Sequence, residues 1–166
     1  MENILQDGDI LICTSNRFIP RLIKWATKSK WTHTCQYFEV DGIAGIIEAQ
    51  MDGINWKPFT EWEKEYGYEY IVYRRKRIVY LNKLKERAFS KAGCTSYDFI
   101  SFCLRQPFKL LTGKFKYRGE EREVERMICS EYTAWIFEIK DWWKLTPDDV
   151  EKSLRLGTRY KIVKES

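Results

Sequence analysis

The chain has 166 residues, of which 44% are hydrophobic and 16% aromatic, and its net charge is +5. Seven tryptophans and this hydrophobic fraction exclude a disordered chain. Since the sequence contains neither repeats nor a Pro/Gly/Ser-rich stretch, it predicts a single domain over residues 1–166. It shows neither a secretory signal sequence nor an apolar run of transmembrane length, so we expect a cytoplasmic protein.

Basic residues cluster at Arg74–Arg77 and between Lys109 and Arg118. Such clusters attract anionic polymers and membrane surfaces. Acidic residues are interspersed in most other windows and no nucleic-acid-binding motif is present, so we expect no nucleic acid partner and at most weak contact with an anionic surface. We interpret residues 74–77 as a solvated edge strand at the point where the chain leaves a sheet.

The first fifty residues predict a strand, a helix and a β-hairpin. Apolar residues follow one another directly over 9–13 and recur at helical spacing over 18–26. Residues 31–38 alternate in polarity. The dipeptide Asp41-Gly42 is typical of a two-residue hairpin turn, so residues 43–50 should form the returning strand.

The rest of the chain is richer in helices. Strands in the first half and helices in the second predict an α+β protein. The predicted elements are a short helix or helical loop at 56–66, a strand at 68–74, a helix at 81–92 ended by Gly93, a helix at 97–106, an exposed excursion or lid at 109–126, a helix from Cys129 to about Lys140, a capped helix opening at Thr146-Pro147-Asp148-Asp149, and a last strand at 159–163.

Two residues suggest a thiol hydrolase. His33 is the only histidine, and Cys129 lies where an apolar-striped helix begins. An imidazole and a helix N-terminus both favour the thiolate that attacks a carbonyl. The alternatives are a half-buried strand histidine with its hydrogen bonds satisfied and a cysteine that packs as a small hydrophobe. The five cysteines form no CxxC pair, which fits reduced thiols, so we expect no disulfide, metal or cofactor.

The hairpin supplies a third candidate. If Val40 pairs with Ile43 across the turn, His33 lies opposite Gln50 and diagonal to Glu48 on the same face. Diagonal neighbours are about 7 Å apart, which a glutamate can span. Glu48 could therefore hold the ring and favour its protonated form, whereas Gln50 is the nearer but neutral rival.

Aromatic and acidic residues near these positions are second-tier candidates. Trp31, Tyr37 and Tyr97 could line a substrate groove, although aromatic residues on a sheet face are more often core. Glu131, in the first turn of the predicted helix, should complement the helix dipole or pair with an arginine, and we assign it a structural role.

Six short motifs, in this order, resemble the circularly permuted papain-like amidases of the YaeF/YiiX type, which belong to the wider NlpC-like superfamily. The resemblance spans nearly the whole chain, and in that family the histidine strand precedes the cysteine helix, as here. The motifs are Gly8-Asp9-Ile10-Leu11, Trp31-Thr32-His33, Ile47-Glu48-Ala49, Tyr97-Asp98-Phe99, Cys129-Ser130-Glu131 and Thr146-Pro147-Asp148-Asp149.

The resemblance implies a circularly permuted papain-like fold, with an antiparallel sheet packed against helices. It also implies Cys129 as nucleophile, His33 as base, Glu48 as the residue that orients the base, and Tyr97 near the nucleophile. The charged stretch before Cys129 separates Tyr97 from it by more residues than the family leads us to expect.

We therefore expect a cysteine amidase or peptidase that hydrolyses an amide bond of a small amide, a peptide or a lipid-like substrate through an acyl-enzyme. The alternative is a non-catalytic lipid- or anionic-surface-binding module on the same fold, which would need neither a reactive Cys129 nor His33.

Overall fold

The computed structural model describes residues 4–14, 24, 29–50, 52–67, 69–77, 80–93 and 127–165. The predicted helix at 97–106, the predicted lid at 109–126 and Tyr97 lie outside this part of the chain. So does the predicted helix at 18–26, apart from Lys24, which is helical.

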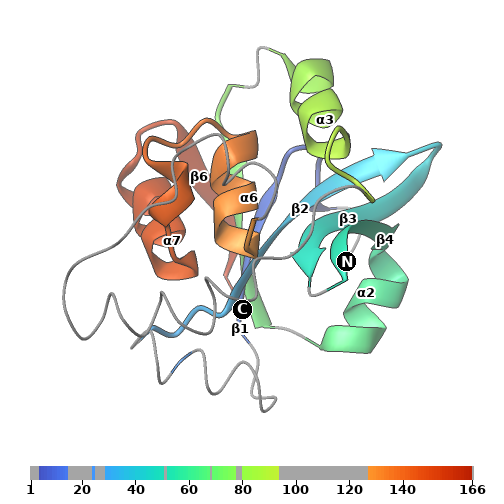
Figure 1. Ribbon diagram of the computed structural model, residues 1–166, viewed down its shortest axis with the longest axis horizontal. Helices are drawn as coiled ribbons and strands as arrows, with labels where there is room; N and C mark the ends of the chain where they lie inside the picture. Colours follow the sequence, from blue (N-terminus) through green and yellow to red (C-terminus); the bar gives the residue numbers. More distant parts are fainter. Residues whose placement is uncertain are drawn as a thin grey trace.

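The described residues form one six-stranded antiparallel sheet with the strand order β4-β3-β2-β1-β5-β6 (Figure 1). The predicted α+β class and antiparallel sheet are confirmed. The strands are β1 (Ile10–Thr14), β2 (His33–Val40), β3 (Ile43–Gln50), β4 (Gly53–Pro58), β5 (Glu69–Arg75) and β6 (Tyr160–Glu165).

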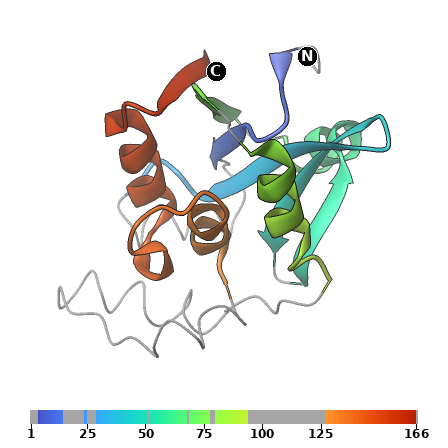
Figure 2. The same cartoon turned by 90° about the horizontal axis from the view of Figure 1, so that it is seen from above.

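Helices cover both faces of the sheet. In Figure 2, α2 lies on one side of the β2–β3 hairpin, and α3 and α6 lie on the other. No helix in the described ranges is long and apolar enough to cross a membrane. The helices are α2 (Phe59–Tyr66), α3 (Leu81–Phe89), α6 (Cys129–Ile136) and α7 (Pro147–Leu156), and a 3₁₀ turn spans Trp142–Lys144.

The core has two parts because the central strands are apolar on both faces. Successive residues of a strand point to opposite faces, and all five residues of β1 are buried. Ile10 and Ile12 pack in the cluster that contains Tyr132 of α6, whereas Leu11 and Cys13 pack in the cluster that contains Trp62 of α2. The sheet is thus held between two apolar layers, and polar side chains that face either layer are removed from water.

The β2–β3 hairpin has the predicted turn and register. Asp41 and Gly42 have φ angles of 52° and 76°, as a two-residue type I′ turn requires. Val40 pairs with Ile43, and the ladder runs back to Gln36 opposite Ile47. Since register decides which side chains share a face, this turn places the end of β3 beside the start of β2.

Strand β4 was not predicted, and α2 begins at Phe59 rather than at Trp56. A short edge strand packed on β3 forms because Trp56 lies over Gly45, where an added Cβ would come within 2.2 Å of the indole ring. The indole N–H also donates to the carbonyl of Phe38 at 3.1 Å. The missing side chain at Gly45 is therefore what lets this tryptophan lie flat on the hairpin.

Helix α6 ends at Ile136, before the predicted boundary at about Lys140. Glu138 and Asp141 have positive φ angles of 54° and 58°, which a right-handed helix excludes. The apolar spacing continues to Ile139 because that residue still packs against the core after the helix has ended. The capped start of α7 is confirmed, with the Thr146 hydroxyl accepting from the Asp149 amide at 3.1 Å.

The interpretation of residues 74–77 as a solvated edge is wrong for Arg74. Strand β5 lies between β1 and β6, so it is not an edge of the sheet. The Arg74 guanidinium donates to both carboxylate oxygens of the fully buried Asp9, at 2.8 and 2.7 Å. The backbone N–H of Gln6 also donates to the Asp9 carboxylate, at 2.9 Å. Arg74 thus neutralises a buried charge in the N-terminal turn.

Replacing Arg74 tests this pairing. Arg74→Met should lower the free energy of unfolding in urea by about 3 kcal/mol, because it leaves a buried carboxylate without its partner. The exposed Arg77 is the matched control, and Arg77→Met should change stability by less than about 0.5 kcal/mol. Equal losses in the two variants would contradict a specific role for Arg74.

Candidate active site

Cys129 is the first residue of α6 and lies where the helix meets β2. Glu131 caps the first turn of α6, since its carboxylate accepts the backbone N–H of Ile128 at 3.1 Å. Glu131 is 1% exposed. Glu131 thus lies in the structural position expected of it. Backbone N–H groups at a helix N-terminus lack partners within the helix and carry partial positive charge, so this position favours a thiolate.

The Cys129 thiol hydrogen-bonds the imidazole of His33, although the two residues are far apart in the sequence. The sulfur also accepts the backbone N–H groups of Ser130 and Thr34. The β2–β3 ladder ends at Gln36, two residues after Thr34 in the chain. The backbone N–H of Thr34 is therefore not used by β3, and it donates to the sulfur. Cys129 is 4% exposed, and its thiol lies among donors in a nearly dry environment.

On its other side, His33 contacts Glu48. The ring Nε2 lies 2.6 Å from a carboxylate oxygen of Glu48, which is fully buried. The same oxygen accepts the indole N–H of Trp62 at 3.1 Å, and the second oxygen accepts the amide of Gln50. The indole N–H can only donate, so the oxygen it shares with His33 acts as an acceptor. The Nε2 of His33 therefore carries a proton, and Nδ1 is the ring nitrogen that faces the thiol.

These contacts shift both titrations in the direction of an ion pair. Burial opposes the charge on each group, raising the pKa of the Cys129 thiol and lowering that of His33. The mutual attraction of the two groups and their shared hydrogen bond outweigh burial. The pKa of His33 is raised well above its usual value, with Glu48 contributing, and the pKa of Cys129 is lowered. The pair thus favours thiolate and imidazolium near neutral pH.

The predicted substrate-binding residues lie in different surroundings. Gln50 hydrogen-bonds Glu48, so it supports the carboxylate instead of competing for the ring. Trp31 and Tyr37 are 7% and 5% exposed and belong to opposite core clusters, which fits the core alternative. Their roles in a substrate groove, like that of Tyr97, stay predictions.

Sequence reasoning missed the residues that α2 contributes. Phe59, Trp62 and Tyr66 recur at the i, i+3, i+7 spacing of a helix face, and the fully buried indole of Trp62 reaches Glu48. That spacing was the available signal. It marks an inward face, but it does not indicate which buried polar group the indole N–H would meet.

One set of donors in the described residues has the chemistry of a metal site. Single ligand atoms of His33, Cys35 and Glu48 lie within 4.8 Å of one another, and nitrogen, sulfur and oxygen together suit zinc. Two ligands of a tetrahedral zinc ion are about 3.4 Å apart, whereas the Nε2–Oε2 separation is 2.6 Å. Burial raises the pKa of the Cys35 thiol well above its usual value, so it stays neutral. The arrangement fits a hydrogen bond between His33 and Glu48 and does not fit a metal ion.

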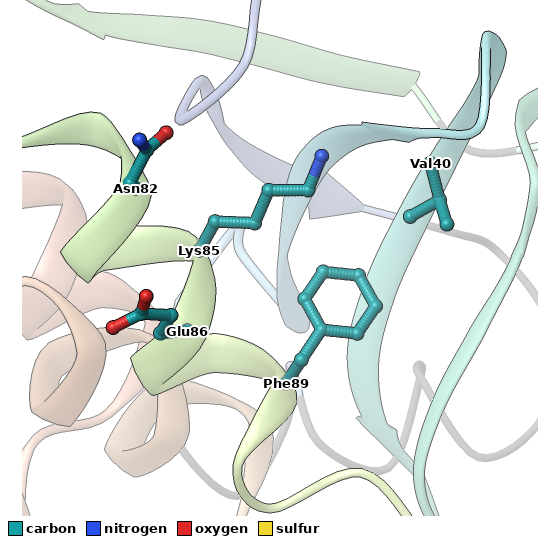
Figure 3. A pocket seen from close by; sticks show the side chains of 5 residues that line it. All are labelled: Val40, Asn82, Lys85, Glu86 and Phe89. Carbon is teal, nitrogen blue, oxygen red and sulfur yellow. The ribbon is translucent and has the colours of Figure 1, made fainter.

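A pocket of about 410 Å³ lies elsewhere on the molecule, between α3 and the end of β2 (Figure 3). Its walls include Val40, Lys85 and Phe89. Val40 and His33 are at opposite ends of β2, roughly 23 Å apart at the rise of an extended strand. This pocket is therefore separate from the candidate active site.

Comparison with known proteins gives a match in structure. No family model and no curated protein sequence matches the chain. The fold is similar to that in the crystal structure of the metalloprotein YiiX from Escherichia coli O157:H7, with a TM-score of 0.63 at 19% sequence identity over 97% of both chains. The papain-like fold predicted from the resemblance to proteins of the YaeF/YiiX type is thereby confirmed.

The thiol should be reactive at a pH where an ordinary cysteine is not. Iodoacetamide should alkylate Cys129 faster than the buried Cys13 and Cys35. The rate should rise with pH through a midpoint below about 8.5, the usual thiol value, because thiolate forms as the lowered pKa is passed. Mass spectrometry of the labelled peptides measures each site separately.

His33→Ala is the control for this reactivity. It removes the positive charge that lowers the pKa of Cys129, so the midpoint should move up to or beyond the usual thiol value. A midpoint that is the same in parent and variant would contradict activation of Cys129 by His33.

Proposed function

We propose that the protein is a cysteine amidase or peptidase that hydrolyses an amide bond through an acyl-enzyme. The observation that carries this proposal is the continuous hydrogen-bonded series Cys129–His33–Glu48, in which the pKa of the thiol is lowered and that of the imidazole is raised. The papain-like fold adds support, since it is a fold on which thiol hydrolysis is known.

Acylation begins with the ion pair. The proton of the Cys129 thiol resides on Nδ1 of His33, and the thiolate attacks the carbonyl carbon of the substrate, forming a C–S bond. The imidazolium then donates this proton to the departing amine as the C–N bond breaks. Glu48 stabilises the positive ring throughout and fixes its orientation through Nε2.

The oxyanion formed in this step needs hydrogen-bond donors. The backbone N–H of Cys129, the first residue of α6, is the donor we assign, since N–H groups in the first turn have no partner within the helix. The N–H groups of Thr34 and Ser130 hold the sulfur. They stabilise the thiolate before attack and again when it leaves the acyl group.

Deacylation reverses the proton transfers. A water molecule donates a proton to the neutral His33 as its oxygen attacks the thioester carbon. The C–S bond breaks, the carboxylic acid is released, and the thiolate–imidazolium pair is restored. We propose a small amide, a peptide or a lipid-like amide as substrate. The mechanism uses no metal ion, because His33, Cys35 and Glu48 do not fit one.

A non-catalytic lipid- or anionic-surface-binding module on the same fold is the second candidate. Such a module has no use for a thiolate–imidazolium pair or for a charged carboxylate buried behind it. Burying the Glu48 carboxylate and orienting three donors around it costs free energy. The hydrolase gives this buried charge a function, whereas the binding module gives it none. This cost favours the hydrolase.

Acylation can be tested directly. With p-nitrophenyl acetate, an activated ester, the protein should release nitrophenol in a burst and carry an acetyl group on Cys129, detected by mass spectrometry. Cys129→Ala should give no adduct, and His33→Ala should slow acylation at least about a hundredfold. Hydrolysis of N-acyl amides and short peptides would then define the substrate class.

The control distinguishes the two candidate functions. If Cys129→Ala leaves ester cleavage unchanged while the protein binds anionic vesicles, the hydrolase proposal is wrong and the binding module is favoured.

A further inference from the structure

The hydrogen bonds at Glu48 continue from the buried site toward the surface. The Gln50 amide donates to Glu48 through Nε2, and its carbonyl oxygen accepts the Tyr66 hydroxyl at 2.9 Å. The Lys57 ammonium donates to the same hydroxyl at 3.1 Å, and the Lys57 side chain is 24% exposed. An ordered series thus joins a surface lysine of β4 to the imidazole of His33.

The donors and acceptors present give each bond in this series a direction. The indole of Trp62 and the ammonium of Lys57 can donate but not accept. The Glu48 carboxylate already receives two N–H groups, so Gln50 must turn its NH₂ group toward it and its carbonyl toward Tyr66. Tyr66 donates to this carbonyl and accepts from Lys57.

We propose that Tyr66, assisted by Lys57, is a positioning residue that locks the Gln50 amide and thereby keeps Glu48 as the anion that holds His33 charged. This inference deepens the proposed function and rests on it for its catalytic meaning. Neither Tyr66 nor Lys57 touches the reacting atoms. Their effect reaches His33 through two side chains of β3.

Groups on α2 and β4 support this direction of bonding. Burial raises the pKa of Tyr66, so its hydroxyl keeps the proton that it donates. The Tyr66 hydroxyl also hydrogen-bonds Glu65, which competes with Gln50 for the phenolic proton, and the 2.8 Å ion pair with Lys57 weakens Glu65 as an acceptor. Burial lowers the pKa of Lys57, yet its hydrogen bonds to Glu65 and Tyr66 raise it overall, so the ammonium remains a donor.

Removing the Tyr66 hydroxyl removes the lock. The planar amide of Gln50 could then rotate by half a turn and bring its carbonyl oxygen against the Glu48 carboxylate, where two acceptors repel each other. Glu48 would lose one of its three donors. The negative charge beside His33 would be less well held, and the imidazolium would lose part of its stabilisation.

The single histidine makes this measurable without turnover. In a Cys129→Ser background, the imidazole of His33 gives one set of ¹⁵N signals, whose pH titration reports its pKa. Among residues 4–14, 29–50, 52–67, 69–77, 80–93 and 127–165, the charged and titratable groups closest to the ring are then Glu48 and the neutral Cys35. Tyr66→Phe should lower this pKa by about half a unit to one unit. A shift of this size is expected because the lost hydrogen bond acts on the charged Glu48 only through Gln50. Lys57→Met should shift it in the same direction by less.

Tyr70→Phe is the matched control. Tyr70 packs on the same Trp62 ring, and its hydroxyl accepts from Lys164 of β6. The pKa of His33 should be unchanged in this variant. If Tyr66→Phe and Tyr70→Phe have the same effect, or if Tyr66→Phe has none, the positioning role is overturned. If Tyr66→Phe lowers the pKa while the parent shows no acyl-enzyme, the positioning role stands and the proposed hydrolase fails.

Discussion

A carboxylate with no exposure to water, that of Glu48, is the group on which the candidate site depends. A buried charge is tolerated only where donors surround it, and Glu48 has His33, Trp62 and Gln50 around its two oxygens. Each donor comes from a different element of the fold. The position of the carboxylate therefore fixes the start of β2, the inward face of α2 and the end of β3 relative to one another.

The hairpin turn makes this arrangement possible. Gly42 and Asp41 set the register, and the β2–β3 ladder reaches only as far as Gln36. Beyond that pair the strand edge is available to other groups, and the thiol of Cys129 takes the N–H of Thr34. The site thus lies where β2 no longer pairs with β3 and the N-terminus of α6 packs against β2. There the Cys129 thiol at the helix start faces the His33 imidazole on the strand.

Local features of the site could be predicted from the sequence because they follow from short periodicities. The Asp41-Gly42 turn and the two-residue period of strands place His33 near Glu48, and their side chains do make contact. The contact between Cys129 and His33 joins distant parts of the chain, so spacing could suggest it only through the resemblance to a known family. The contact of Trp62 with Glu48 also joins two elements of the fold, and helix spacing marks an inward face without naming the polar group that it meets.

The errors in the predicted fold have physical causes of the same kind. Arg74 looked solvated because a run of basic residues carries no sign of the buried Asp9 that pairs with it. Helix α6 looked longer because Ile139 keeps the apolar spacing after Glu138 has left the helical conformation. In each case a tertiary contact, and not a local preference, decides the structure.

The most direct test of the account is the alkylation rate of Cys129 against pH in Glu48→Gln beside the parent. An amide can orient the ring but cannot stabilise its charge, so the pKa of His33 should fall and that of Cys129 should rise. The account predicts that the midpoint of the alkylation profile moves to higher pH, in a protein whose urea unfolding remains cooperative. An unchanged midpoint in Glu48→Gln, or an upward shift caused by Gln50→Ala alone, would contradict the assignment of the buried carboxylate as the group that holds the imidazolium.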